Sequence, residues 1–202
     1  MKREIFFVTG TDTGVGKTVL TALLVKFLRG RGVNAAALKP ICSGNRDDAR
    51  TIFAAMNGAL SLDEINPWHF RAAVAPLLAA RREKKRVKFS QVVAYTHAMH
   101  GRFDILLVEG AGGLLSPLGE NFDSRDLILT LRAMPIIVAQ NKLGAVNQVL
   151  LTLEALPKNL QAKSRVVLVS SKKPDASTGT NAKLLAEFLD PGKIFLLPRL
   201  NK

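Results

Sequence analysis

The chain has 202 residues, 48% of them hydrophobic, which is enough apolar material for one domain, residues 1–202, with a sizeable core. We expect no membrane association and no secretion, because no apolar run approaches the roughly 20 residues that span a bilayer and the N-terminus lacks a signal peptide. The formal net charge is +13, but the 29 basic residues are dispersed, so we expect no nucleic-acid partner, and the single cysteine, Cys42, favours a cytoplasmic location.

Short apolar runs alternate with helical patterns along the chain. In the first half of the chain, the patterns predict a strand at 5–9, a helix from Gly16 to Gly30 or Gly32, a strand at 35–39 and a polar loop at 40–45. Helices follow at 47–57 and 75–84, and a third runs from an N-cap at Ser90 to about Gly101. In the second half, the patterns predict strands at 104–109, 135–139, 166–170 and 194–197, with helices at 146–155 and 180–189 between them.

Buried strands separated by helices predict an α/β fold, a single domain with a mostly parallel sheet covered by helices on both faces. In such sheets, ligands bind beyond the carboxyl ends of the strands. The motifs described next each follow a predicted strand in that position.

The first motif is GTDTGVGKT at 10–18, between a predicted strand and a predicted helix. A phosphate-binding loop usually reads G-x-x-x-x-G-K-[ST], which would place its first glycine at 11. The sequence has Thr11 there, and Gly10 lies one position earlier. The motif is therefore a phosphate-binding loop with a displaced first glycine.

The remaining residues of this loop carry the expected chemistry. Gly14 and Gly16 allow backbone N–H groups to approach a phosphate closely, and the helix N-terminus adds a favourable dipole. Lys17 can reach the outer phosphates, and the Thr18 hydroxyl can bind Mg²⁺.

Acidic and basic residues follow the other predicted strands. Glu109 ends the run DILLVE before a glycine-rich stretch, where it can hold a metal directly or through water. Lys39 follows the second strand and is either a catalytic lysine that stabilises developing negative charge or an ordinary surface lysine. Asp47 and Asp48 are each either a second metal ligand or a helix N-cap.

The segment KLGAVNQ at 142–148 opens a helix that either binds an anion or has no ligand.

In order along the chain, GTDTGVGKT at 10–18, KPICSG at 39–44, VEGAGG at 108–113 and KLGAVNQ at 142–148 resemble the motifs of the dethiobiotin synthetase family. Weaker similarity covers AVAPLLAA at 73–80 and PRL at 198–200, so the resemblance spans nearly the whole chain. In that family the displaced first glycine is normal, because the residues between Gly10 and Gly16 both surround phosphate and line the substrate site.

The resemblance implies a P-loop NTPase-like fold and an ATP-dependent enzyme that uses CO₂ and Mg²⁺ to close the ring of dethiobiotin from 7,8-diaminononanoate. It makes Lys39 the catalytic lysine. It assigns the metal to Thr18, Asp48 and Glu109, with Asp47 as the alternative to Asp48. It assigns the nucleotide to Gly14, Val15, Gly16, Lys17, Thr18, Val19, Glu109, Gly110, Ala111, Gly112, Ser171 and Pro198. It assigns the substrate to Thr13, Lys39, Ser43, Gly144, Ala145, Val146 and Asn147.

The family also implies a homodimer, in which the segment 142–148 reaches the site from the neighbouring subunit. The chain departs from the family pattern at Ser171 and Lys172, where relatives carry an adenine-reading Asn followed by Asp, and at Leu77, where many carry His. A hydroxyl cannot reproduce the paired donor and acceptor of a carboxamide, so we expect weak discrimination among nucleoside triphosphates.

Three other classes compete with this interpretation. A partition-type, DNA-associated ATPase would have an extra lysine early in the loop, and 10–12 has none. A catalytically silent nucleotide-binding regulator would not need Lys39 or Ser43. Amide-forming relatives that act on corrinoids are longer, multi-domain chains.

Overall fold

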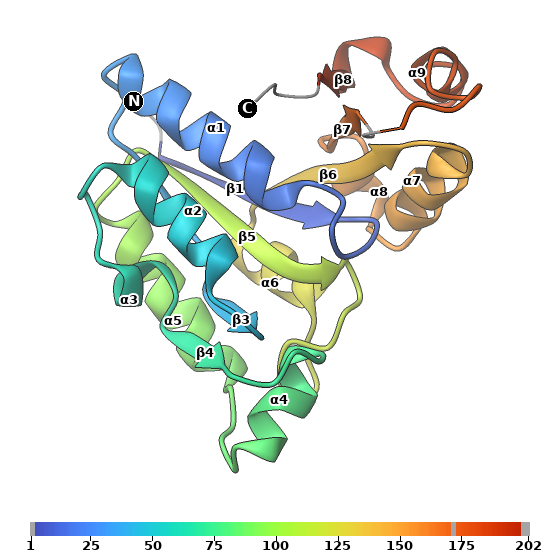
Figure 1. Ribbon diagram of the computed structural model, residues 1–202. Coiled ribbons are helices and arrows are strands. Elements are labelled where there is room, and N and C mark those ends of the chain that lie inside the picture. Colours follow the sequence, from blue (N-terminus) through green and yellow to red (C-terminus); the bar gives the residue numbers. More distant parts are fainter. Residues whose placement is uncertain (1–2, 171–172, 199–202) are drawn as a thin grey trace.

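The computed structural model describes residues 3–170 and 173–198. Within them, a six-stranded sheet has the order β2-β5-β1-β6-β7-β8, and every neighbouring pair is parallel. The carboxyl ends of its strands therefore share one edge, toward which the arrows of β1 and β5 point in Figure 1. The strands are β1 (Glu4–Gly10), β2 (Ala35–Leu38), β5 (Ile105–Gly113), β6 (Met134–Asn141), β7 (Arg165–Ser170) and β8 (Ile194–Leu197).

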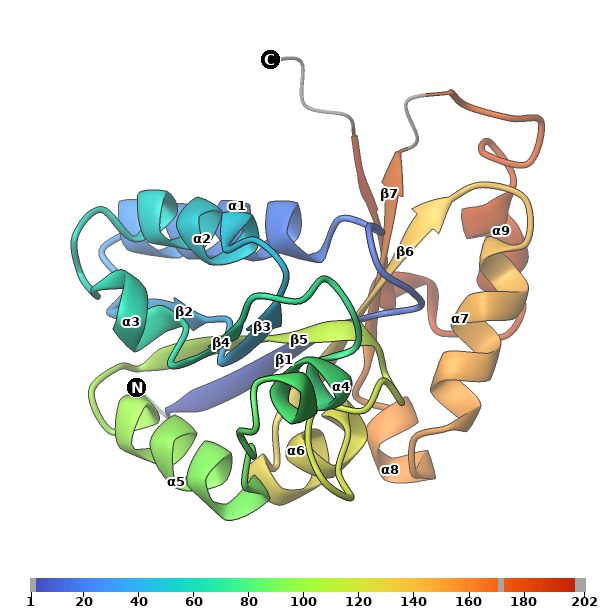
Figure 2. The same ribbon diagram turned by 60° about the horizontal axis from the view of Figure 1, so that its bottom comes forward.

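Helices cover both faces of this sheet, as the alternating pattern predicted. Figure 2 shows α1 (Lys17–Gly30) and α2 (Asp47–Met56) on one face, with α5 (Phe89–His100) and α6 (Ser124–Leu131) on the other. The strands β2, β5 and β6 are apolar on both sides because helices cover both faces of the sheet there: all four residues of β2 are buried, and so are the central residues of β5 and β6. α7 (Ala145–Glu154) packs against β6.

The predicted loop at 40–45 is wrong in part. Ile41–Ser43 forms β3, which pairs in parallel with β4 (Trp68–Phe70) as a separate two-stranded sheet. Both strands have three residues and lie far apart in sequence, so neither shows a periodic pattern. The short helices α3 (Leu62–Ile65) and α4 (Pro76–Arg82) flank this pair.

Other boundaries also differ from the predictions. Ser90 is not an N-cap, because α5 already begins at Phe89 and Lys88 occupies the cap position. Neither Asp47 nor Asp48 caps α2, whose cap position is Arg46; both lie in its first turn. α6 was not predicted, although Asp123 and Asp126 form a capping box at its start.

The C-terminal part contains the short helices α8 (Lys158–Gln161) and α9 (Asn181–Leu185) and a 3₁₀ turn at Pro191–Lys193. The predicted helix at 180–189 is therefore shorter than expected. The last strand, β8, is not a buried strand: it lies at the edge of the sheet, and Phe195 and Leu196 are exposed. Within the described ranges, no helix is long and apolar enough to cross a membrane.

Candidate active site

The loop between β1 and α1 has the backbone that a phosphate cradle needs. Gly14 and Gly16 lie in the left-handed region, with φ of 70° and 103°, which favours glycine. Gly16 occupies the cap position of α1 and no side chain caps that helix, so the first N–H groups stay available to an anion. Val15 is buried in a small apolar cluster with Val8, Leu20, Ile136, Val138 and Val167, which anchors the loop.

Lys17 lies under this loop rather than in solvent. Its side chain is buried, and Nζ donates to the Asp12 carbonyl at 2.8 Å. Burial, followed by the nearby ammonium of Lys39, lowers the pKa of Lys17 from 10.5 to about 8. Because its ammonium is poorly solvated, a phosphate oxygen placed beside Lys17 would strongly stabilise the charged form of the side chain.

Lys39 follows β2, and β2 pairs with β5 so that Leu38 lies opposite Val108. The next residues, Lys39 and Glu109, therefore face each other at the carboxyl edge. Lys39 Nζ lies 2.6 Å from Glu109 Oε1 and 3.0 Å from Asp48 Oδ2, and it donates to the Gly110 carbonyl at 3.0 Å. Burial alone would lower its pKa, but the two carboxylates hold the pKa of Lys39 above the ordinary value.

The two aspartates proposed as alternatives lie differently. Asp48 faces Lys39, and although burial opposes it, the lysine holds the pKa of the Asp48 carboxyl below its usual value. Asp47 instead accepts from the Asn45 amide at 2.6 Å and pairs with Arg50 at 3.3 Å. Only Asp48 shares the site with Lys39 and Glu109.

The oxygens around Glu109 fit a magnesium ion. The Thr18 hydroxyl donates to Glu109 Oε1 at 2.7 Å, while the buried Oε2 has no hydrogen-bond partner in the part of the chain that the structure describes. Two carboxylates and a hydroxyl suit Mg²⁺, which takes one or two carboxylates and completes its shell with water and phosphate. No group of three or more His, Cys, Asp or Glu residues that could hold a metal occurs among the described residues, so a site made only of such side chains is not found there.

The glycine-rich end of β5 is packed too closely for side chains. A Cβ on Gly110 would lie 2.7 Å from Ser124 Oγ, and Gly112 has a φ of 70°. Ala111, between them, is half-buried, and Thr13 is exposed next to Gly112. The backbone of this stretch therefore borders the phosphate loop directly.

Ser43 and the segment 142–148 lie at the same edge. The Ser43 hydroxyl donates to the Val74 carbonyl at 2.6 Å and keeps its lone pairs as acceptors. Gly144 caps α7 with a φ of 86°, but the N–H of Leu143 already donates to Asp175 Oδ2 at 2.8 Å. An open hollow of about 510 Å³ separates α7 from the residues after β5, and it is lined by Thr11, Gly113–Pro117, Gln148, Leu151, Thr152 and Ala155.

Comparisons with known proteins agree with this arrangement. A family model described as an AAA domain matches residues 4–197. The ATP-dependent dethiobiotin synthetase BioD of Akkermansia muciniphila is 38% identical over 186 residues, 92% of this chain and 87% of that protein. The protein of the same name from Anaeromyxobacter sp. strain Fw109-5 is 44% identical over 154 residues, covering 74% of this chain and 69% of its own length. The chain belongs to the ATP-dependent dethiobiotin synthetase family.

Solved structures support the fold. FtsY from Mycoplasma mycoides matches with a TM-score of 0.59 at 15% identity, over 99% of this chain and 61% of its own. The hydrogenase maturation factor HypB from Archaeoglobus fulgidus matches with a TM-score of 0.54 at 15% identity, over 97% of this chain and 81% of its own. The predicted P-loop NTPase-like fold and membership of the dethiobiotin synthetase family are thereby confirmed, and neither the partition-type ATPase nor the silent regulator is favoured.

The other residues assigned by the family resemblance are spread along the same edge. Val19 is exposed on α1, Ala145 is buried, Val146 is half-buried, and Asn147 and Pro198 are exposed. Ser171 and Lys172 lie outside the described residues, so the expectation about nucleotide choice stays a prediction. Leu77, which replaces the histidine of many family members, is half-buried at the start of α4.

Sequence reasoning did not find three residues that hold this site. The Asn66 amide donates to the Lys39 carbonyl at 2.8 Å and so fixes the backbone of the lysine. The Asp12 carbonyl accepts from Lys17, and Asp175 holds Leu143. Asp12 lies within the loop motif, but Asn66 and Asp175 act across the fold and carry no local signal.

Proposed function

We propose that this enzyme converts 7,8-diaminononanoate, CO₂ and ATP to dethiobiotin, ADP and phosphate. One observation carries the proposal: a buried lysine, Lys39, lies between two carboxylates beside a phosphate-binding loop. A nucleotide-binding module without catalysis would not need a buried ammonium there. The family assignment supplies the substrate, since its members carry the name of that reaction.

The reaction requires that the substrate and ATP be held in position and that the negative charge of the carbamate and phosphates be neutralised. One amine of the substrate takes up CO₂ to give a carbamate, whose oxygen attacks the γ-phosphorus of ATP as ADP leaves. The second amine then attacks the carbonyl of the carbamic-phosphoric anhydride and expels phosphate, which closes the cyclic urea. Lys39 would stabilise the carbamate and the transferring phosphoryl group.

The other assignments follow from the same edge of the sheet. Thr18, Asp48 and Glu109 would hold Mg²⁺, which neutralises phosphate charge when bound. Residues 14–19 and 109–112, with Ser171 and Pro198, would bind the nucleotide. Thr13 and Ser43 would bind the diamine part of the substrate.

The carboxylate of the substrate would bind at Gly144–Asn147 of a second subunit. One observation supports a homodimer of this kind. Leu115 and Leu151, which line the hollow beside α7, are exposed, and Leu143, two positions before α7, is 79% exposed. Exposed apolar side chains that gather on one face are typical of a protein interface. We also propose a cytoplasmic location, as the single cysteine led us to expect.

Phosphate release from MgATP and bicarbonate, measured with and without 7,8-diaminononanoate, tests the proposal. We expect release to depend on the diamine and to fall about 100-fold or more in Lys39→Ala, with Lys26→Ala of α1 as the matched control. Ser43→Ala should raise the KM for the diamine and leave that for ATP nearly unchanged. Diamine-independent release that DNA stimulates would overturn the proposal in favour of the partition-type ATPase.

A further inference from the structure

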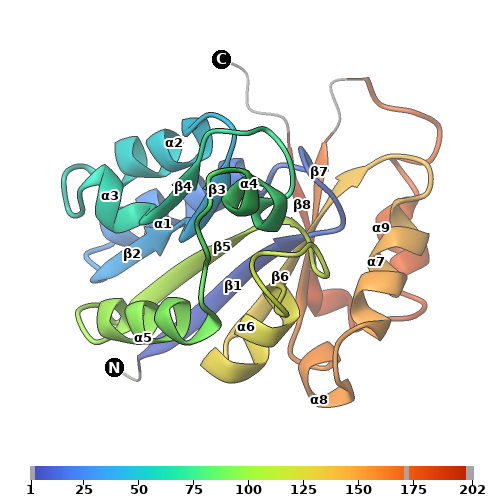
Figure 3. The same ribbon diagram turned by 90° about the horizontal axis from the view of Figure 1, so that it is seen from below.

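A second hollow lies at the opposite edge of the sheet. It has a volume of about 710 Å³, within the range of small-molecule sites. It opens where β1 and β6 begin and where α5 and α6 end, and Figure 3 shows α5, α6 and α8 along this side of the sheet, with the start of β1 beside α5. Its lining residues include Arg3, Ile5, His97, His100, Leu131, Arg132, Met134, Leu160 and Lys163.

The rim of this hollow is cationic. Arg3, His97, Arg132 and Lys163 line it together with a single acid, Glu4. None of these five side chains makes a hydrogen bond or ion pair with another residue of the described ranges. Some basic residues elsewhere are paired with a carboxylate: Arg81 contacts Glu120, and Arg102 contacts Glu64. The hollow therefore gathers the cations of Arg3, Arg132 and Lys163 against the one carboxylate of Glu4.

A fifth basic group, His100, points to an absent partner. Its Nε2 is buried and has no hydrogen-bond partner in the described part of the chain. Burial, followed by the charges of His97 and Arg3, lowers the pKa of His100. An anion placed among these groups would satisfy the imidazole and relieve the repulsion.

The floor of the hollow is apolar. Ile5, Ile128, Leu131, Ala133 and Leu160 line it, and all belong to the buried residues of the structure. The hollow has no Phe, Tyr or Trp among its lining residues, so it offers no aromatic platform for a nucleobase. An apolar floor under a cationic rim suits a ligand with an anionic head and an aliphatic body.

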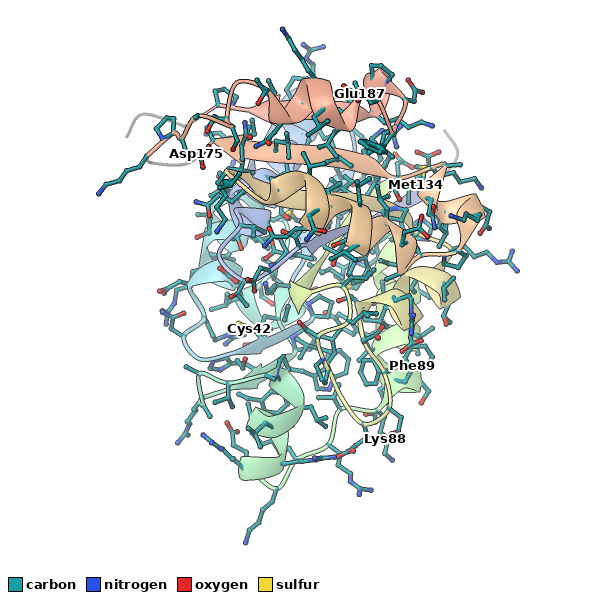
Figure 4. All side chains as sticks on the ribbon, turned by 90° about the vertical axis from the view of Figure 1, so that its right-hand side faces the viewer. Cys42, Lys88, Phe89, Met134, Asp175 and Glu187 are labelled. Carbon is teal, nitrogen blue, oxygen red and sulfur yellow. The ribbon has the colours of Figure 1, made fainter. Side chains whose placement is uncertain are left out.

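We propose that this hollow binds a medium-chain aliphatic monocarboxylate, with the carboxylate at Arg3, His97, Arg132 and Lys163 and the chain over Ile5, Leu131 and Leu160. The site is separate from the active site. In Figure 4, Met134 of the hollow and Asp175 lie at opposite ends of the sheet. At about 3.3 Å per residue, the eight residues of β6 separate the two edges by roughly 25 Å. The inference does not depend on the proposed function.

Calorimetric titration of the full chain at low ionic strength tests this proposal, with octanoate as the probe. Octan-1-ol has the same body without charge, and inorganic phosphate has charge without the body. The double variant Arg132→Gln/Lys163→Gln removes two rim cations. Its control, Lys26→Gln/Arg82→Gln, removes the same charge from exposed positions of α1 and α4. Both variants alter exposed side chains and leave the core intact.

We expect octanoate to bind the unaltered chain and the control with equal affinity, and the rim variant about tenfold more weakly. Histidine NMR should show the pKa of His100 rising when octanoate binds. Equal affinity of the rim variant and the control would overturn the proposal, because the probe would then occupy another site. Binding of octan-1-ol or phosphate as tight as that of octanoate would overturn the ligand class.

Discussion

Two buried lysines lie at the same edge of the sheet, and they are held in opposite ways. Lys17, under the phosphate loop, is 6% exposed, and among the described residues its ammonium donates a hydrogen bond to the Asp12 carbonyl and to no carboxylate. Lys39, after β2, is 2% exposed, and its ammonium contacts two carboxylates. Burial lowers the pKa of the first, and the carboxylates raise the pKa of the second. Burial by itself therefore does not decide how a lysine behaves; the charge beside it does.

The difference suits two tasks. The loop lysine forms no ion pair within the described part of the chain, so a phosphate beside it would supply a close counter-charge and contribute to the binding free energy. The charge of the strand-end lysine is already balanced by two carboxylates, and the side chain keeps its proton at any physiological pH. Three substitutions test this contrast between the two lysines.

The largest effect is expected for Lys39→Met. The substitution leaves the fully buried carboxylate of Glu109 without its cation, and breaking a buried ion pair costs about 3–5 kcal/mol of the free energy of unfolding. Urea unfolding measures this cost. The double variant Lys39→Met/Glu109→Leu should recover most of it, because an apolar pair replaces the ion pair. A loss below about 1 kcal/mol in the single variant would show that Glu109 is not buried as described.

Lys17→Met should do the reverse and stabilise the protein at neutral pH. Because the pKa of Lys17 falls from 10.5 to about 8 on folding, its charged form opposes folding at every pH below about 8. Replacing it should raise the free energy of unfolding by about 1–3 kcal/mol at pH 7. The gain should shrink between pH 8 and 10.5, where the unfolded chain binds more protons than the folded one. A gain that stays constant to pH 10.5 would contradict a lowered pKa.

The smallest effect is expected for Asp48→Asn. The side chain of Asp48 is 47% exposed, so solvent screens its pairing with Lys39, and we expect a loss of about 1 kcal/mol or less at pH 7. The pKa of Asp48 is lowered on folding, so its contribution is present above pH 3.8 and lost as the pH falls below that value. Thermal unfolding at pH 7 and pH 3 compares the two states. Asp47→Asn is the control, and an equal loss in both variants would remove the distinction between them.

The phosphate loop could be predicted because its residues are contiguous. The glycines, Lys17 and Thr18 act within a few residues of one another, so their spacing alone indicates the task. The meeting of Lys39 with Glu109 could be predicted only in part. Both follow strands, but the pairing of β2 with β5 brings them within 2.6 Å, and strand order is not a local property of the sequence.

The errors have the same origin. β3 was interpreted as a loop because its partner strand, Trp68–Phe70, lies 27 positions further along the chain in register. The capping box at Asp123 was a readable signal for α6 and was missed. Asn66 lies 27 positions after Lys39 and holds its backbone carbonyl by a hydrogen bond. No motif around Asn66 in the sequence predicts this contact.

The burial of Val15 in the middle of the phosphate loop affects how much the loop must be ordered when nucleotide binds. Five apolar residues from β1, α1, β6 and β7 surround this side chain, so the loop is tied to the sheet on both sides of its glycines. A loop already fixed in this way surrenders little conformational freedom when a ligand arrives. Little of the free energy of the contacts between its N–H groups and a phosphate is then spent on ordering the loop. The loop therefore binds nucleotide as a preformed site and does not need to close over it.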